Sequence, residues 1–335
     1  MMMKNEIKDR ILWMDLLNIT AILGVIMMHT NDAQNHFNGI LTSEYIWACA
    51  VHSFFMWPVA AFYMLTGCNL LNYGGAINHY IKRRIEKVLI PFIAWSFFYW
   101  GLRCRDITGF DFVNYFINGE FINIMWFFIP LFAIYLSIPF MRVMVINCSR
   151  RKIEIFLLLS FIFCSVCPFL SKLTPLEIND ILFPMGANFL WFAVLGYYLG
   201  NYEFTIKQCK IYYSLGMIAV FIHFAGFILI NYFTGKQNSV FMNCTVPTSV
   251  LFVIAVFLKY RYSKWNFLKK FKKYVVAISS CTFGVYLIHI IVKHGIEILV
   301  PSLVNCYWGV IPIYAISLLV ILFMKRIPLV KMLVP

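Results

Sequence analysis

Four polar residues along the first apolar segment are of the types that carry acid–base chemistry. They are Asp15, Asn18, His29 and Asp32, at offsets of 0, 3, 14 and 17 residues. At about 100° per residue a helix places all four within roughly a third of its circumference, so they form one polar stripe. A neutral imidazole titrates near physiological pH, so His29 suits a general base that Asp32 orients. The alternative is a histidine that only hydrogen-bonds a neighbouring helix.

A second polar stripe lies near the end of the chain, in the segment AISSCTFGVYLIHIIVK. Its polar residues again recur at helical spacing: Ser279, Thr282, Tyr286, His289 and Lys293. Two such stripes, each with a histidine, predict a cavity between the first and the ninth apolar segments. A structural seam of hydrogen bonds between helices explains His289 equally well.

A third candidate is the basic segment HYIKRRIEKVLIP. Arg84 and Lys87 lie one helical turn apart, with Arg83 beside them. Paired cations on one helix face suit a phosphate-bearing ligand. Ordinary charge at the cytoplasmic face of a membrane, or attraction to anionic lipid, explains the same residues, and the spacing alone favours that interpretation.

The segments that carry these residues are too apolar for a water-soluble domain. Of the 335 residues, 62% are hydrophobic and 13% are charged, and the mean hydropathy is +0.79. Apolar runs long enough to cross a ~30 Å hydrocarbon core recur from end to end. The sequence therefore predicts an all-α, polytopic membrane protein of about ten transmembrane helices, with residues 1–335 as one membrane domain. The expected spans are 11–31, 46–72, 88–102, 122–141, 153–170, 185–200, 211–232, 246–258, 274–298 and 308–324.

The distribution of basic residues predicts the orientation. The net charge of +14 is confined largely to alternate breaks between spans, which indicates membrane topology and not a nucleic-acid partner. The exceptions, on the opposite side or at its boundary, are Arg103, Arg105, Lys172, Lys236 and Lys293. The positive-inside rule therefore places both termini in the cytoplasm, and the first span is expected to remain in the mature protein.

The ten cysteines are scattered and lie mostly inside spans. Cys164 and Cys167 form the one close pair, in an apolar helix without a histidine partner. Packing between helices explains them better than redox chemistry, and the sequence predicts no metal site.

Six segments, in this order, resemble the acyltransferase family 3 membrane proteins, particularly the stand-alone O-acetyltransferases of bacterial surface polysaccharides and enterobacterial common antigen. They are WMDLLNITAILGVIMMHT, PVAAFYMLTGCNLL, KRRIEKVLIPFIAWS, MWFFIPLFAIYLSIPF, NFLWFAVLGYYLG and ISSCTFGVYLIHIIV. The resemblance implies acyl transfer from cytoplasmic acetyl-CoA, or another acyl-CoA, to a hydroxyl of a lipid-linked or surface saccharide. It also implies a location in the bacterial cytoplasmic (inner) membrane.

The resemblance assigns roles to particular residues. The family's first motif is a basic residue, ten intervening residues and a histidine, and that histidine corresponds to His29. The basic position corresponds to Asn18, a departure that keeps a hydrogen-bond donor but loses the charge. The second motif, two arginines separated by two residues, corresponds to Arg84 and Lys87, where lysine keeps the charge but loses the bidentate fork.

Together the residues and the resemblance suggest one mechanism. The phosphates of CoA lie near Arg84 and Lys87, and the pantetheine arm follows the stripe of Asp15 and Asn18 towards His29. His29 removes the acceptor's proton, and the thioester oxyanion is stabilised by donors such as Tyr286 or His289. No metal is needed.

Two other classes of protein fit the same pattern. A transporter or flippase for a glycan or a small acid also needs spans with a polar interior, and the loss of charge at Asn18 favours it. A structural subunit of a polysaccharide-assembly complex would tolerate the loss of His29. Trp126, at the outer start of the fourth span, is a candidate platform for a sugar ring, although an interfacial anchor explains a tryptophan there better.

Overall fold

The computed structural model describes residues 10–31, 37, 39–72, 74–122, 124–174, 189–304 and 307–335, and within these ranges the chain forms helices and no strand. A helix satisfies its own backbone hydrogen bonds, as a bilayer requires. Eight helical segments within the described ranges are long and apolar enough to cross a membrane, which confirms a polytopic membrane protein. They are Leu12–Thr30, Ser43–Leu70, Ile77–Arg103, Met125–Asn147, Arg150–Leu173, Ile206–Thr234, Thr282–Leu299 and Tyr307–Met324.

Several of these segments are built from more than one element. Proline begins α4, where its missing N–H costs nothing. The elements are α2 (Leu12–Thr30), α3 (Ser43–Phe54), α4 (Pro58–Leu70), α5 (Ile77–Arg84), the π-helical turn η2 (Ile85–Leu89), α6 (Ile90–Arg103), η3 (Met125–Phe127), α8 (Phe128–Asn147), α9 (Arg150–Phe161), η4 (Ile162–Val166), α10 (Cys167–Leu173), α12 (Ile206–Thr234), α15 (Thr282–Leu299), η6 (Tyr307–Gly309) and α17 (Val310–Met324). Shorter elements between or after them are α7 (Gly109–Asn118), η5 (Asn266–Phe271), α14 (Lys272–Ser279), α16 (Pro301–Val304) and η7 (Val330–Met332).

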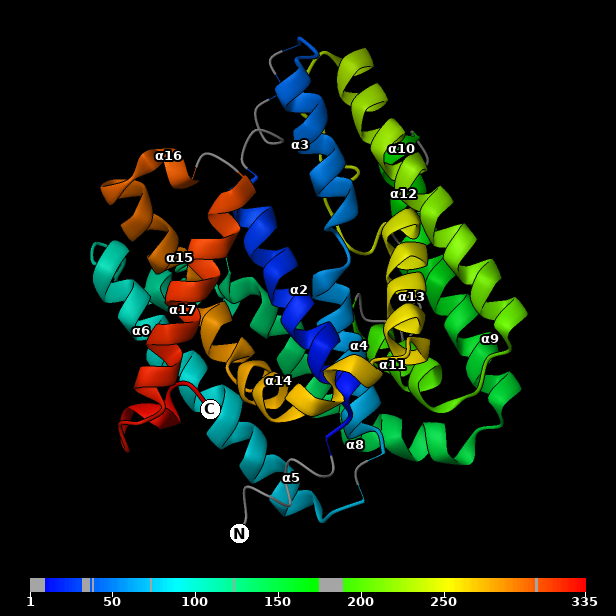
Figure 1. Ribbon diagram of the computed structural model, residues 1–335, viewed down its shortest axis with the longest axis horizontal. Helices are drawn as coiled ribbons and strands as arrows, with labels where there is room; N and C mark the ends of the chain where they lie inside the picture. The colour runs from blue at the N-terminus through cyan, green and yellow to red at the C-terminus, as the bar shows by residue number, and fades with distance from the viewer. Residues whose placement is uncertain are drawn as a thin grey trace.

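The two other predicted spans coincide with shorter helices, α11 (Leu190–Asn201) and α13 (Pro247–Tyr262). Residues 185–188 of the predicted sixth span lie outside the described ranges. In the described part, α11 packs against α4, α8, α9 and α13, so protein and not lipid surrounds most of it (Figure 1).

Helices α4 and α11 cross at a pair of glycines. A Cβ atom on Gly67 would lie 1.9 Å from the carbonyl oxygen of Ala193, and one on Gly196 would lie 1.9 Å from that of Met64. Each backbone therefore occupies the space that a side chain on the other helix would need. Small residues permit such close approach in membrane helices.

This crossing predicts a large difference between two glycine substitutions. Gly196→Ala forces the two backbones apart, and we expect it to lower the free energy of unfolding by about 1–3 kcal/mol or more. Gly101→Ala, where no atom lies within 4 Å of the added methyl, leaves stability unchanged or slightly raises it. Unfolding of the two purified variants in detergent measures both effects. A Gly196→Ala protein as stable as the wild type would contradict the crossing.

Helix α2 is central and packs against α4, α13, α14, α15 and α17 (Figure 1). The predicted single span over 274–298 is wrong at one point, because α14 ends at Ser279 and α15 begins at Thr282. The hydroxyl of Ser280 donates to the carbonyl oxygen of Ala277 at 2.7 Å, and such a local bond competes with the helix. The break turns the end of α14 towards the start of α2.

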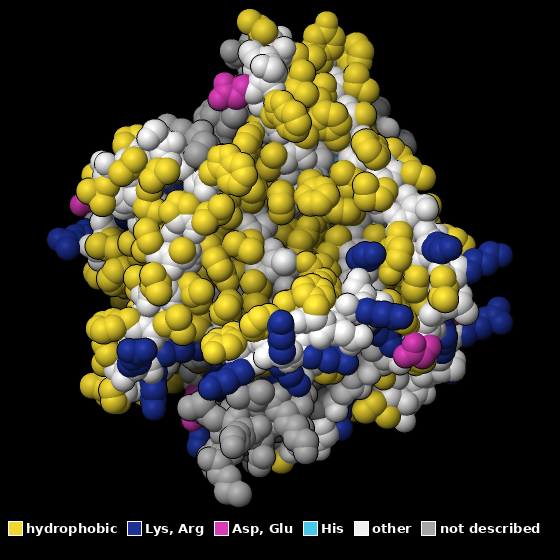
Figure 2. Space-filling model, viewed as in Figure 1, with side chains coloured by type: hydrophobic (Ala, Val, Ile, Leu, Met, Phe, Trp, Pro, Cys, Tyr) yellow, Lys and Arg dark blue, Asp and Glu magenta, His cyan; other side chains and the backbone are white. Residues whose placement is uncertain are grey.

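The outer surface is apolar where a soluble protein would be polar. Large side chains such as Leu136, Phe221 and Leu319 are more than half exposed on α8, α12 and α17. Figure 2 shows Lys and Arg gathered along the lower part of the molecule, the end at which Figure 1 places α5 and the C-terminus. By the positive-inside rule this is the end predicted to face the cytoplasm.

Candidate active site

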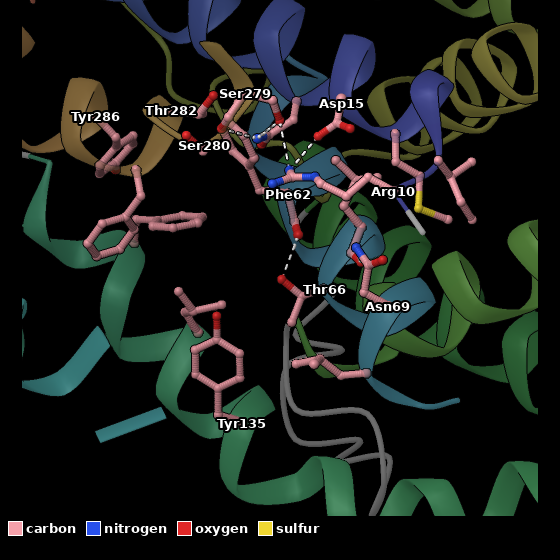
Figure 3. A pocket seen from close by; sticks show the side chains of 18 of the residues that line it. Arg10, Asp15, Phe62, Thr66, Asn69, Tyr135, Ser279, Ser280, Thr282 and Tyr286 are labelled. Atoms are coloured by element: carbon pink, nitrogen blue, oxygen red, sulfur yellow. Dashed lines mark hydrogen bonds and ion pairs between the residues drawn. The ribbon is translucent and has the colours of Figure 1, made fainter. Parts of the chain in front are cut away.

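The first cavity opens beside the start of α2 and has a volume of about 430 Å³ (Figure 3). We call it the basic cavity, because its wall contains two arginines. It is lined by Arg10, Ile11, Met14, Asp15, Asn18, Phe62, Leu65, Thr66, Asn69, Leu70, Arg84, Phe127, Leu131, Tyr135, Ser279, Ser280, Thr282, Phe283 and Tyr286. The structure thus brings together residues of both predicted stripes with one residue of the basic segment.

A polar network joins α2 to the break between α14 and α15. Nη2 of Arg10 donates to Oδ1 of Asp15 and, at 3.3 Å, to Oγ of Ser279. The amide of Asn18 donates to the same Oγ at 3.0 Å and to the carbonyl oxygen of Ser279 at 3.1 Å. Lys325 donates to the carbonyl oxygen of Ser280 at 2.7 Å, and burial lowers the pKa of its amino group. These contacts hold the helix break against α2.

The basic segment places its three cations differently. Arg84 lines the basic cavity, and its guanidinium carbon lies 5.6 Å from the ring centre of Tyr80 and 5.1 Å from that of Tyr135. Its Nε is buried, with no hydrogen-bond partner among the described residues. Arg83 is half-buried and Lys87 is exposed, and neither lines the cavity. The π-helical turn η2 follows Arg84 directly, so Lys87 does not continue the α-helical face of Arg84.

The second cavity lies at the other end of α2 and has a volume of about 500 Å³. We call it the His29 cavity. Its wall is lined by Met28, His29, Arg103, Cys104, Glu120, Phe121, Ile122, Ile290, Lys293 and His294. Asn18 and His29 are eleven residues apart, about 16 Å along the helix, so the two cavities are separated along the direction of α2.

Three aromatic side chains lie between the two cavities. The ring centres of His29 and His289 are 5.2 Å apart, and those of His289 and Tyr286 are 5.7 Å apart. His289 is fully buried, whereas Tyr286 borders the basic cavity and His29 borders the other. The partition between the cavities is therefore a row of rings from α2 and α15.

Tyr286 and His289 each form a hydrogen bond with a backbone carbonyl oxygen. The hydroxyl of Tyr286 donates to the carbonyl oxygen of Ile124 at 2.8 Å. Nδ1 of His289 lies 2.7 Å from the carbonyl oxygen of Tyr286, so this nitrogen carries the proton. Nε2 of His289 is then a bare acceptor, buried and without a partner in the described part of the chain. Both predicted oxyanion donors are thus engaged with backbone carbonyls in this structure.

Two predicted site residues lie apart from this arrangement. Asp32 falls outside the described residues. Trp126 is 41% exposed, lines neither cavity and has its ring centre 6.0 Å from that of Phe189. In the described ranges no group of three or more histidine, cysteine or acidic side chains is placed to hold a metal ion.

The structure also adds site residues that the motifs did not single out. Arg10 precedes α2 and bends back to Asp15, so helical spacing from Asn18 does not identify it. Arg103 and Glu120 lie near the two ends of the break between the third and fourth predicted spans, and both line the His29 cavity. Arg103 is one of the exceptions to the positive-inside bias, and this is the feature of the sequence that could have identified it as a site residue.

Comparison with known proteins gives a family match. A family model described as an acyltransferase domain matches residues 11–325, from the start of α2 to just past α17. No match was found among curated proteins or solved structures. The match covers all eight candidate membrane-spanning segments of the described ranges, and the chain belongs to the acyltransferase family 3 of membrane proteins.

Proposed function

We propose that this protein is a membrane O-acyltransferase that moves an acetyl or another short acyl group from acyl-CoA to a hydroxyl of a cell-surface or lipid-linked saccharide. The observation that carries the proposal is the pair of cavities at the two ends of α2, with His29, His289 and Tyr286 between them. A donor from one side and an acceptor from the other would meet at this partition. Such an arrangement explains why a transferase is built from membrane helices.

The basic cavity suits the donor. Arg84 and Arg10 offer guanidinium groups to the phosphates of CoA, with Arg83 and Lys87 adding positive charge nearby. Past the arginines the wall includes apolar side chains such as Phe127 and Phe283, which suit the pantetheine arm. The thioester would then lie against Tyr286.

The His29 cavity suits the acceptor. Its wall combines Arg103, Glu120 and Lys293 with aromatic and aliphatic side chains. A saccharide presents many hydroxyl groups that donate to and accept from such charged side chains. Trp126, exposed on η3, is retained as a candidate platform for a sugar ring at this end of the protein.

The reaction follows from these positions. His29 takes the proton of the acceptor hydroxyl as the oxygen attacks the thioester carbonyl carbon, and a C–O bond forms. The tetrahedral oxyanion is stabilised by the hydroxyl of Tyr286, which first releases the carbonyl oxygen of Ile124. The C–S bond then breaks, and the CoA thiolate takes the proton from the imidazolium of His29. The ring of His289 lies 5.2 Å from that of His29, between His29 and Tyr286.

The direct test uses acyl-CoA with two labels, one in the acetyl group and one in the adenine ring. Membranes that contain the protein are supplied with lipid-linked saccharides, and the glycan is extracted. We expect the acetyl label, and not the adenine label, in an alkali-labile ester of the saccharide. Absence of acetyl label with several donors and acceptors, together with protein-dependent movement of saccharide across vesicles, would instead establish a transporter.

A further inference from the structure

The positive charge of the basic cavity comes from two arginines, one of which lies outside the predicted motifs. Among its described lining residues the cations are Arg84, at the end of α5, and Arg10, directly before α2. Asp15 is the acidic residue of the same wall, so the wall keeps a net positive charge. A guanidinium suits phosphate because its N–H groups form a planar fork.

Arg10 lies beside Asn18 in this wall. Both side chains donate to Oγ of Ser279, Asn18 at 3.0 Å and Arg10 at 3.3 Å. Figure 3 shows Arg10 between Asp15 and Ser279. The guanidinium is therefore at the place where the polar stripe of α2 meets the break before α15. Asn18 itself carries no charge, so Arg10 is the residue that brings a positive charge to this part of the wall, where it pairs with Asp15.

The surroundings of Arg10 hold it in place and still leave it accessible. Asp15 is only 3% exposed and pairs with Nη2, whereas the Arg10 side chain is 39% exposed. In the described part of the chain, the hydrogen bonds of Arg10 all come from Nη2. An arginine has five N–H donors, so the N–H groups of Nε and Nη1, which face different directions, can each donate to an anion while Asp15 fixes the orientation of the guanidinium.

We infer that Arg10 binds a phosphate group of the acyl donor from the α2 side of the basic cavity. Arg84, at the end of α5, contributes the other guanidinium of the wall. This inference rests on the proposed function and names a residue of its donor site. Asp15 acts as a positioning residue, because it holds the guanidinium and does not meet the ligand.

The test moves the positive charge of Arg10 to position 18, eight residues along the chain. We compare the wild type with Arg10→Gln, Arg10→Gln/Asn18→Arg and Arg10→Gln/Asp15→Asn. The probes are CoA and S-acetyl-pantetheine, which lacks the phosphates, and the readouts are the dissociation constants of the purified proteins in detergent. The melting temperature of each variant reports on folding.

We expect Arg10→Gln to weaken CoA binding by about 10- to 100-fold, the range of a hydrogen bond to a charged group, and to leave binding of S-acetyl-pantetheine unchanged. Arginine at position 18 should restore CoA binding to within a few-fold. A purely structural role predicts the opposite pattern, in which neutral Asp15→Asn restores CoA binding in the absence of Arg10. That result, or equal CoA binding by wild type and Arg10→Gln, overturns the inference alone. Failure of the wild type to bind CoA overturns the donor assignment and the inference with it.

Discussion

Replacement of His29 by alanine should lower acyl transfer by about 10²- to 10⁴-fold, the contribution of a positioned general base. The loss should lie in kcat, because the proposed phosphate contacts of the donor lie at the other end of α2, about 16 Å away along the helix. We therefore expect the KM for acyl-CoA and the dissociation constant of CoA to stay within a few-fold of the wild-type values. Initial rates with labelled acyl-CoA, together with CoA titration of the same preparation, measure both quantities.

His294 provides the matched control for this substitution. It lines the same cavity as His29, but its Nδ1 lies 3.1 Å from Oε2 of Glu297. His294→Ala removes an imidazole of the same size from the same wall, and we expect it to retain transfer within about threefold. Equal losses in the two variants would show that the cavity needs bulk or charge there and not a base at position 29.

The sequence predicted which helices the site would come from, because periodicity reports the face of a helix. Both stripes do line cavities between α2 and α15. Periodicity does not report depth, however, and the stripe of α2 divides between two cavities, with Asn18 in one and His29 in the other. The separation became visible only once the rings of Tyr286 and His289 were placed between them.

The fold was predictable to the level of elements, since apolar runs of membrane length have few alternatives. The errors came from local backbone chemistry. A serine pair ended α14 at Ser279, where hydropathy predicted one continuous span. The short helix α11 is possible because α4 and α11 approach through glycines, a feature of the packed pair that neither segment shows alone.

Arg10 shows a different limit of sequence analysis. It lies before the first helical residue, so no helical offset relates it to Asp15 or Ser279, and only the folded chain brings them together. Charge patterning counted it among cytoplasmic basic residues, as it counted Arg84 and Lys87. The distribution of basic residues predicts on which side of the membrane a residue lies. It does not distinguish a cation that binds a ligand from one on the surface.

Arg84 and Lys87 allow that separation to be measured. Arg84→Ala should raise the dissociation constant of CoA by about 10- to 100-fold, because it removes a half-buried guanidinium from the cavity wall. Lys87→Ala removes an exposed charge outside the wall, and we expect a change of about twofold, mostly lost at high salt. Titrations of the purified variants with CoA at low and high ionic strength provide the comparison.

The two substitutions remove the same formal charge from positions three residues apart, so general attraction of an anion to this end of the protein would affect them alike. A large effect at Arg84 alone therefore requires contact within the basic cavity, and the π-helical turn η2 explains why the neighbouring cation does not share it. A larger effect at Lys87 would move the phosphates to the exposed side of α5. The donor would then have to enter past that surface, and the contacts of Arg84 with the rings of Tyr80 and Tyr135 would be structural.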